Sequence, residues 1–112
     1  MEDDPLASFR LDDRLIIVTG ASQGIGRHLA EGFARAGAVV VLASRRADRL
    51  EEVRDAIVAR GGRAVAVATD VTRLPDLDVL AYAVSGLALG EERRIVLVNN
   101  AGFGFTKAAL EI

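Results

Sequence analysis

The sequence predicts an α/β fold: a doubly wound parallel sheet of four strands in the order 3-2-1-4, with helices on both faces. Four apolar runs of strand length alternate with three segments in which apolar residues recur at helical spacing. This alternation is typical of parallel strands joined by helices, and right-handed crossovers favour that strand order. Only 4% of the residues are aromatic, whereas 51% are hydrophobic, so the core must consist mainly of aliphatic side chains, as in buried parallel sheets.

The length and charge of the chain limit what it can be. Its 112 residues suffice for one domain, which we place at residues 13–112, after a polar leader at 1–12. A net charge of −2 gives no electrostatic basis for a nucleic acid or anionic membrane as partner. With no cysteine and a single histidine, disulfides and thiolate or histidine-rich metal sites are excluded. No signal peptide or membrane-length apolar run is visible, so we expect a cytoplasmic protein.

The first half of the predicted domain contains two strands and the helix between them. The apolar runs at residues 15–18 and 39–43 are the strands. Gly37 supplies the stop signal of the helix. The apolar stripe of this helix is predicted to be Ile25, Leu29, Phe33 and Ala36.

A second helix follows, with Asp48 as its N-terminal cap and Gly61 and Gly62 at its end. Its predicted apolar stripe is Leu50, Val53, Ile57 and Val58. The third strand covers residues 64–68.

The third helix is predicted to carry Pro75 in its first turn, where a missing N–H costs nothing. Its apolar stripe is Leu77, Leu80, Val84 and Leu87. The fourth strand covers residues 95–98, and a further helix is predicted to begin within residues 106–110. No strand pattern follows the fourth strand, so we expect its outer edge to have no partner within this chain.

The glycine-rich stretch TGASQGIG, residues 19–26, joins the first strand to the first helix. Gly20 permits a tight turn, Gly24 lets the backbone approach a pyrophosphate, and Gly26 lets the helix pack closely on the sheet. The N–H groups at the helix start attract phosphate, and the Ser22 hydroxyl adds a donor. A glycine-rich turn that binds no ligand is the alternative.

Three motifs together resemble the short-chain dehydrogenase/reductase family. The stretch 19–26, which includes Gln23 and Ile25, is similar to the family's TGxxxGxG motif. Asp70-Val71 and Asn99-Asn100-Ala101-Gly102 resemble its Asp-Val pair and its NNAG motif, in the same order. The resemblance runs from about residue 11 to 110. It implies a Rossmann-type domain and an oxidoreductase that transfers hydride between a nicotinamide cofactor and a carbonyl or alcohol substrate.

The resemblance also implies roles for these residues at a cofactor site. Asp70 should accept from the adenine amino group, and the Val71 backbone N–H should donate to the adenine. Asn100 and Ala101 should border the adenosine and ribose. Asn99 should tie the fourth strand to its neighbours, while Gly102 completes the motif.

The end of the second strand favours NADP(H) over NAD. NAD sites usually place a carboxylate there to accept from the ribose 2′-hydroxyl, and this chain has Ser44, followed by Arg45 and Arg46. Guanidinium groups pair with phosphate, so Arg45 is the predicted 2′-phosphate contact and Ser44 assists it. One departure weakens the preference: many NADP-preferring relatives have a basic residue where this chain has Gln23. A solvated helix start is the alternative for the two arginines.

The resemblance does not extend to a catalytic group. The family's acid/base is a tyrosine with a lysine four residues later, downstream of NNAG. The only tyrosine here, Tyr82, is followed at that distance by Gly86, and no tyrosine precedes Lys107 at that spacing. We therefore assign no catalytic residue, expect Tyr82 and His28 to face solvent, and expect the 112-residue chain to be inactive.

Three hypotheses remain open for the chain as a whole. The first is the cofactor-binding half of a longer NADP-dependent reductase, a homo-oligomer acting on a small carbonyl or alcohol substrate. Phe103 and Phe105 would border its substrate pocket or pack against the rest of the enzyme. The second is a stand-alone dinucleotide-binding or regulatory module without catalysis. The third, a methyltransferase of related fold, is disfavoured by the glycine spacing and by Ser44.

Overall fold

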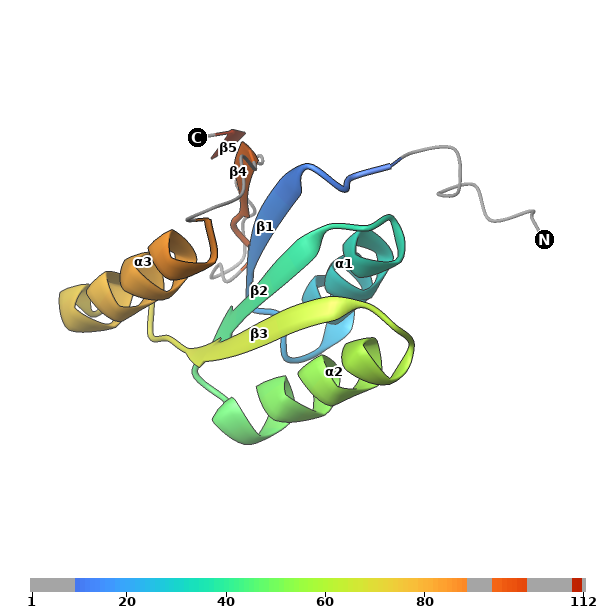
Figure 1. Ribbon diagram of the computed structural model, residues 1–112. Helices are drawn as coiled ribbons and strands as arrows, with labels where there is room; N and C mark the ends of the chain where they lie inside the picture. The colour runs from blue at the N-terminus through green and yellow to red at the C-terminus, as the bar shows by residue number, and fades with distance from the viewer. Residues whose placement is uncertain (1–9, 89–93, 101–109, 112) are drawn as a thin grey trace.

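The computed structural model describes residues 10–88, 94–100 and 110–111. Its elements are β1 (Arg14–Thr19), α1 (Gly24–Arg35), β2 (Val39–Ser44), α2 (Ala47–Ala59), β3 (Arg63–Ala68), α3 (Leu74–Ala88), β4 (Arg94–Val98) and β5 (Leu110–Glu111). They form one sheet in the order β3-β2-β1-β4-β5 (Figure 1). Because β1 to β4 are parallel and lie in the order 3-2-1-4, the predicted doubly wound fold is confirmed.

The outer edge of β4 differs from the expectation. β5 pairs with it antiparallel, with Val96 opposite Glu111 and Leu97 opposite Leu110. The expectation that nothing in this chain pairs with that edge is therefore wrong, and Leu110 lies in a strand rather than in a helix. Backbone groups at the edge of an apolar strand need partners, and β5 supplies some of them. Residues 106–109 lie outside the described residues.

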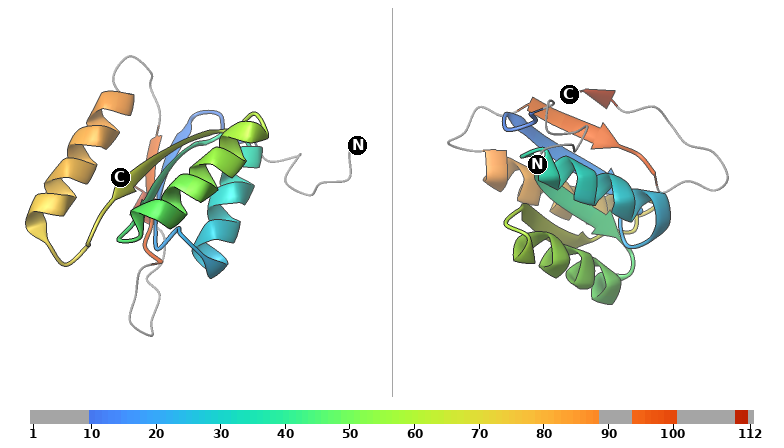
Figure 2. Two further views of the ribbon diagram at one scale, coloured as in Figure 1. Left: turned by 90° about the horizontal axis from the view of Figure 1, so that it is seen from below. Right: turned by 90° about the vertical axis from the view of Figure 1, so that its right-hand side faces the viewer.

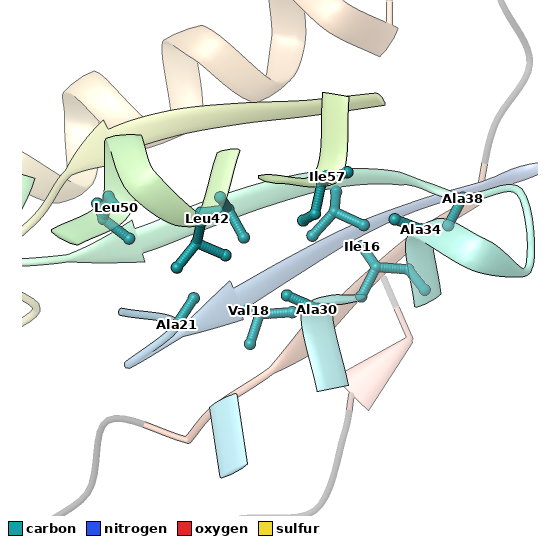
Figure 3. Packing of buried hydrophobic residues seen from close by; sticks show 11 residues of the cluster. Ile16, Val18, Ala21, Ala30, Ala34, Ala38, Leu42, Leu50 and Ile57 are labelled. Carbon is teal, nitrogen blue, oxygen red and sulfur yellow. The ribbon is translucent and has the colours of Figure 1, made fainter. Parts of the chain in front are cut away.

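The two faces of the sheet carry different helices, with α1 and α2 on one face and α3 on the other (Figure 2). Alternate residues of β1 and β2 point to opposite faces, as the pleat requires. The core under α1 and α2 contains Ile16, Val18, Ala21, Ala30, Ala34, Ala38, Val40, Leu42, Leu50, Val53 and Ile57 (Figure 3). The core under α3 contains Leu15, Ile17, Val41, Ala43, Leu80 and Val84.

The predicted stripe of α1 is confirmed only in part, since Ala36 is buried and Phe33 packs against the core. Gly26, Ala30 and Ala34 are buried, whereas Ile25 is 71% exposed. Small side chains let the helix axis lie close to the sheet, so the face lined by glycine and alanine turns inward. Ile25 is left beside the glycine-rich loop rather than in the core.

The other two helices follow their predicted stripes in part. α2 buries Leu50, Val53 and Ile57, while Val58 is exposed. Asp48 lies in the first turn of α2, and Arg46 occupies the N-cap position, so the prediction that Asp48 caps the helix is wrong.

On α3, Leu80 and Val84 are buried, whereas Leu77 is 36% exposed. Pro75 is the second residue of that helix, as predicted. Among the described residues no helix has both the length and the apolarity needed to cross a membrane.

Candidate cofactor site

The loops that follow the parallel strands lie at one end of the sheet. Thr19 is level with Ala43, Ser44 with Ala68, and Val18 with Val98. The carboxyl ends of β1 to β4 therefore meet at one edge (Figure 1). In sheets of this kind ligands bind beyond that edge.

The glycine-rich loop between β1 and α1 has the backbone geometry that glycine allows. Gly24 has φ +61°, a conformation that L side chains rarely adopt, and a Cβ there would point into open space. A Cβ on Gly26 would instead collide with the carbonyl oxygen of Gly20 and lie 2.7 Å from Asn100 Nδ2. The loop thus leaves an open cradle at Gly24 above the start of α1, with space for a phosphate group.

A hydrogen-bond network joins this loop to the residues after β4. The Asn100 backbone N–H donates to Thr19 Oγ1 over 2.8 Å, and Thr19 Oγ1 lies 3.1 Å from Asn99 Oδ1. Asn100 Nδ2 donates to the Gly20 carbonyl over 3.4 Å. Sequence reasoning overlooked Thr19; its place as the last residue of a buried strand facing the NNAG motif was the available signal. Ala101 and Gly102, also predicted at the site, lie outside the described residues.

The end of β2 is tied to the same loop by two serines. The Ser44 hydroxyl donates to Ser22 Oγ over 3.1 Å and accepts the Arg46 backbone N–H over 3.2 Å. Ser22 is buried, whereas Arg45 and Arg46 are exposed. Both guanidinium-bearing residues therefore lie in solvent next to the glycine-rich loop.

A polar cavity of about 430 Å³ lies between the starts of α1 and α2. It is lined by Ser22, Gln23, Gly24, Arg27, Arg46, Asp48, Arg49 and Glu52. Arg49 Nη1 donates to Gln23 Oε1 over 3.1 Å and so bridges α2 and the loop. Sequence reasoning missed Arg27 and Arg49. For Arg49 the signal was its spacing of three residues from Arg46, which puts both on one face of the first turns of α2.

Asp70, after β3, carries a local hydrogen-bond cap. Its Oδ1 accepts from the Thr72 hydroxyl over 2.6 Å and from the Thr72 backbone N–H over 3.0 Å. The hydroxyl contact, followed by the backbone contact and the charges of Arg45 and Arg73, lowers the pKa of Asp70 below its ordinary value. Its own N–H donates to Asp76 Oδ2 over 2.8 Å. The Asp70 carboxylate is therefore ionised at neutral pH. The neighbouring Val71 is half-buried.

Other candidates from the sequence lie apart from these loops. Tyr82 is 82% exposed on α3, and His28 is exposed on α1, as expected. Within residues 10–88, 94–100 and 110–111, no three His, Cys, Asp or Glu side chains gather as metal ligands would. These loops together offer groups suited to a dinucleotide phosphate chain with an adenosine at one end. They are the open backbone at Gly24, the hydrogen-bonded Ser22 and Ser44, the arginines and the ionised Asp70.

Known proteins match this chain over most of its length. The family described as short chain dehydrogenase matches residues 14–112. 7alpha-hydroxysteroid dehydrogenase of Escherichia coli (strain K12) is 43% identical over 101 residues, which are 89% of this chain and 38% of that protein. A structure of L-sorbose reductase from Gluconobacter frateurii with NADPH and L-sorbose has a TM-score of 0.75 and 36% identity, over 88% of this chain and 37% of that one.

A structure of 7 alpha-hydroxysteroid dehydrogenase with NADH and 7-oxo glycochenodeoxycholic acid has a TM-score of 0.76 and 42% identity. It covers 94% of this chain, and this chain covers 39% of it. The chain thus spans about two fifths of the length of the relatives it matches.

Proposed function

This chain belongs to the short-chain dehydrogenase family, and from that premise we propose that residues 13–112 form the cofactor-binding part of an NADP-dependent oxidoreductase. The complete enzyme would transfer hydride between NADP(H) and a small molecule with a carbonyl or alcohol group. Its relatives include a hydroxysteroid dehydrogenase and a sorbose reductase, which act on such groups. One solved relative holds NADPH and another NADH, so the choice of cofactor has to come from this chain's own residues.

The observation that carries the NADP assignment is the chemistry at the end of β2. Ser44 stands where an NAD site would place a carboxylate, and its hydroxyl is bonded to Ser22 of the glycine-rich loop. Arg45 and Arg46 follow it in solvent. A 2′-phosphate beside Ser44 would meet guanidinium groups and no carboxylate from that strand end.

The remaining loops divide the rest of the cofactor between them. The pyrophosphate would lie over Gly24 at the positive end of α1, and the adenine beside Asp70 and Val71. Asn100, held by Thr19, would border the ribose together with Ala101. The nicotinamide would supply the hydride chemistry when bound, and these residues would hold the remainder of the cofactor. No tyrosine–lysine pair of the family's spacing is present in the sequence, so the 112-residue chain by itself should not reduce carbonyls.

Isothermal titration of the chain with NADPH and NADH tests the assignment. Arg45→Ala should weaken NADPH binding about ten- to a hundredfold, the worth of a charged hydrogen bond, and NADH binding less than about twofold. Arg63→Ala is the matched control, because Arg63 is an exposed arginine at the start of β3, away from the strand ends that carry the site. It should change the affinity for neither cofactor. Equal losses for both cofactors after Arg45→Ala would contradict the 2′-phosphate assignment.

A second candidate, a dinucleotide-binding module without turnover, is favoured by the pairing of β5 with β4. That pairing gives the edge of β4 a partner within the same chain. A module predicts a monodisperse species with one cooperative thermal transition, measured by light scattering and circular dichroism. Aggregation and a broad transition would contradict this second candidate.

A further inference from the structure

A side-chain hydrogen bond joins α2 to the glycine-rich loop across the polar cavity. Arg49 Nη1 donates to Gln23 Oε1, the side-chain amide that stands just before the second glycine of the motif. Both residues line the cavity, together with Ser22 and Gly24 of the loop. A guanidinium has several N–H donors in a rigid fork, so the contact with Gln23 uses one of them and leaves others for a ligand.

The three arginines that line this cavity differ in whether a carboxylate lies beside them. Arg27 pairs with Glu31 over 3.2 Å, and Arg46 lies 3.8 Å from Asp48. Arg49 bonds to a neutral amide instead, so this contact leaves its charge uncompensated. Glu52 also lines the cavity and opposes anion binding there. Arg27 and Arg46 thus lie beside carboxylates, whereas the hydrogen bond of Arg49 goes to the neutral amide of Gln23.

Arg45 differs in its position from the arginines that line the cavity. It is absent from the cavity lining, and its charge acts on Asp70 at the next strand end. Arg46 and Arg49 line the cavity instead, beside Ser22, whose hydroxyl is bonded to Ser44. A 2′-phosphate placed near Ser44 would therefore have Arg45 on its adenine side and the cavity on its other side.

We propose that Arg49 is a specificity-determining residue for the 2′-phosphate, held in place by Gln23. Gln23 cannot supply a charge itself, and Arg49 brings a guanidinium from α2 to the same point, compensating for the neutral side chain. This inference rests on the proposed NADP-binding function and adds a residue to it. The ligand recognised is a phosphomonoester on the 2′-oxygen of an adenosine.

The test compares two probes that differ only in that phosphate, adenosine 2′,5′-bisphosphate and adenosine 5′-monophosphate, by isothermal titration of the full chain. Arg49→Gln should weaken binding of the bisphosphate about tenfold and that of the monophosphate less than about twofold. Arg54→Gln removes the same charge from the same helix at a residue paired with Asp55 and outside the cavity, and it should change neither. Arg49 is exposed, so its replacement should leave the fold intact.

A relocated charge separates phosphate binding from a structural role of the bridge. In the Arg49→Gln background, Gln23→Lys should restore most of the preference for the bisphosphate, although it cannot rebuild the original hydrogen bond. Equal behaviour of Arg49→Gln and Arg54→Gln, with the preference of the unmodified chain intact, would overturn the role of Arg49 and leave the NADP assignment standing. If the unmodified chain shows no preference for the bisphosphate, both proposals are wrong.

Discussion

Helices α1 and α2 have an arginine-lined cavity at each end, and the two cavities have opposite electrostatic settings. The cavity at their starts is about 430 Å³ and contains Arg27, Arg46 and Arg49. The cavity at their ends is about 250 Å³ and is lined by Arg10, Glu31, Ala34, Arg35, Gly37, Ala56, Ile57, Arg60, Gly61 and Gly62. If only the arginines in the two linings were considered, either cavity would be expected to bind an anion.

The direction of the helices distinguishes the two cavities. Free backbone N–H groups give the start of a helix a partial positive charge, and free carbonyls give its end a partial negative one. Arginines at the ends of α1 and α2 therefore offset the helices' own charge, whereas those at the starts add to it. Hence arginine stabilises the helices at one end of the layer, whereas at the other end it adds to the positive charge that the proposed phosphate site requires.

The largest effect we expect comes from filling the tight helix contact at the phosphate end. Gly26→Ala forces a methyl group against the Gly20 carbonyl, and backbone cannot move aside as a side chain can. The free energy of unfolding should fall by about 3 kcal/mol, at the upper end for overpacking, and NADPH binding should be lost with the displaced loop. Urea denaturation and titration measure the two effects.

Gly62→Ala is the matched change at the other end. Its Cβ would lie 2.7 Å from Ile57 Cγ2 and 3.2 Å from the Ile57 carbonyl oxygen, a milder conflict than the collision of a Gly26 Cβ with the Gly20 carbonyl. We expect a cost of about 1 kcal/mol and unchanged NADPH binding. Equal costs for the two substitutions would mean that the contact at Gly26 is no more rigid than the one at Gly62.

The next effect comes from restoring a carboxylate at the end of β2. Ser44→Asp places a negative charge beside the proposed 2′-phosphate and offers an acceptor to a ribose 2′-hydroxyl. NADPH affinity should fall about a hundredfold while NADH affinity holds or rises, measured by titration with both cofactors. Parallel losses would point to damage of the Ser44–Ser22 bridge; Ser44→Ala, which removes the bridge without adding charge, provides that comparison.

Much of this end of the molecule followed from the sequence, because its signals are local. The alternation of apolar runs predicted the strand order, and the spacing of Gly20, Gly24 and Gly26 predicted a tight turn from strand to helix. The inward face of α1 was predicted only in part, because an apolar stripe counts Ile25 and ignores the packing value of small residues such as Ala30 and Ala34. The role of each predicted residue toward the cofactor stays a prediction.

Contacts between segments far apart in sequence were beyond local patterns. The bridge from Arg49 to Gln23 spans 26 residues and depends on how α2 lies against the loop. β5 covers two residues, too few for an alternating pattern to be recognised. In both cases tertiary geometry, rather than composition, decides which groups meet.

A smaller effect concerns the pH dependence of Asp70. Its pKa is lowered chiefly by the Thr72 hydroxyl, so the stabilisation from these contacts is fully present above the ordinary value of 3.8 and is lost as the pH falls through the lowered value. Thr72→Val should raise the pKa of Asp70 toward 3.8. A carbon-detected NMR titration of the Asp70 carboxyl group in the unmodified chain and in Thr72→Val measures this shift. An unchanged pKa would contradict the role of the hydroxyl.

The smallest effect should come from removing a charge at the carbonyl end of α2. Arg60 occupies the C-cap position there, and Arg60→Gln should cost at most about 1 kcal/mol of stability, because it removes only a screened attraction to the last carbonyls. NADPH affinity should stay within about twofold, since the helix ends repel an anion. A severalfold loss of NADPH affinity would show that phosphate is drawn to this cavity too. Arginine content would then outweigh helix direction, and the distinction between the two ends of α1 and α2 would fail.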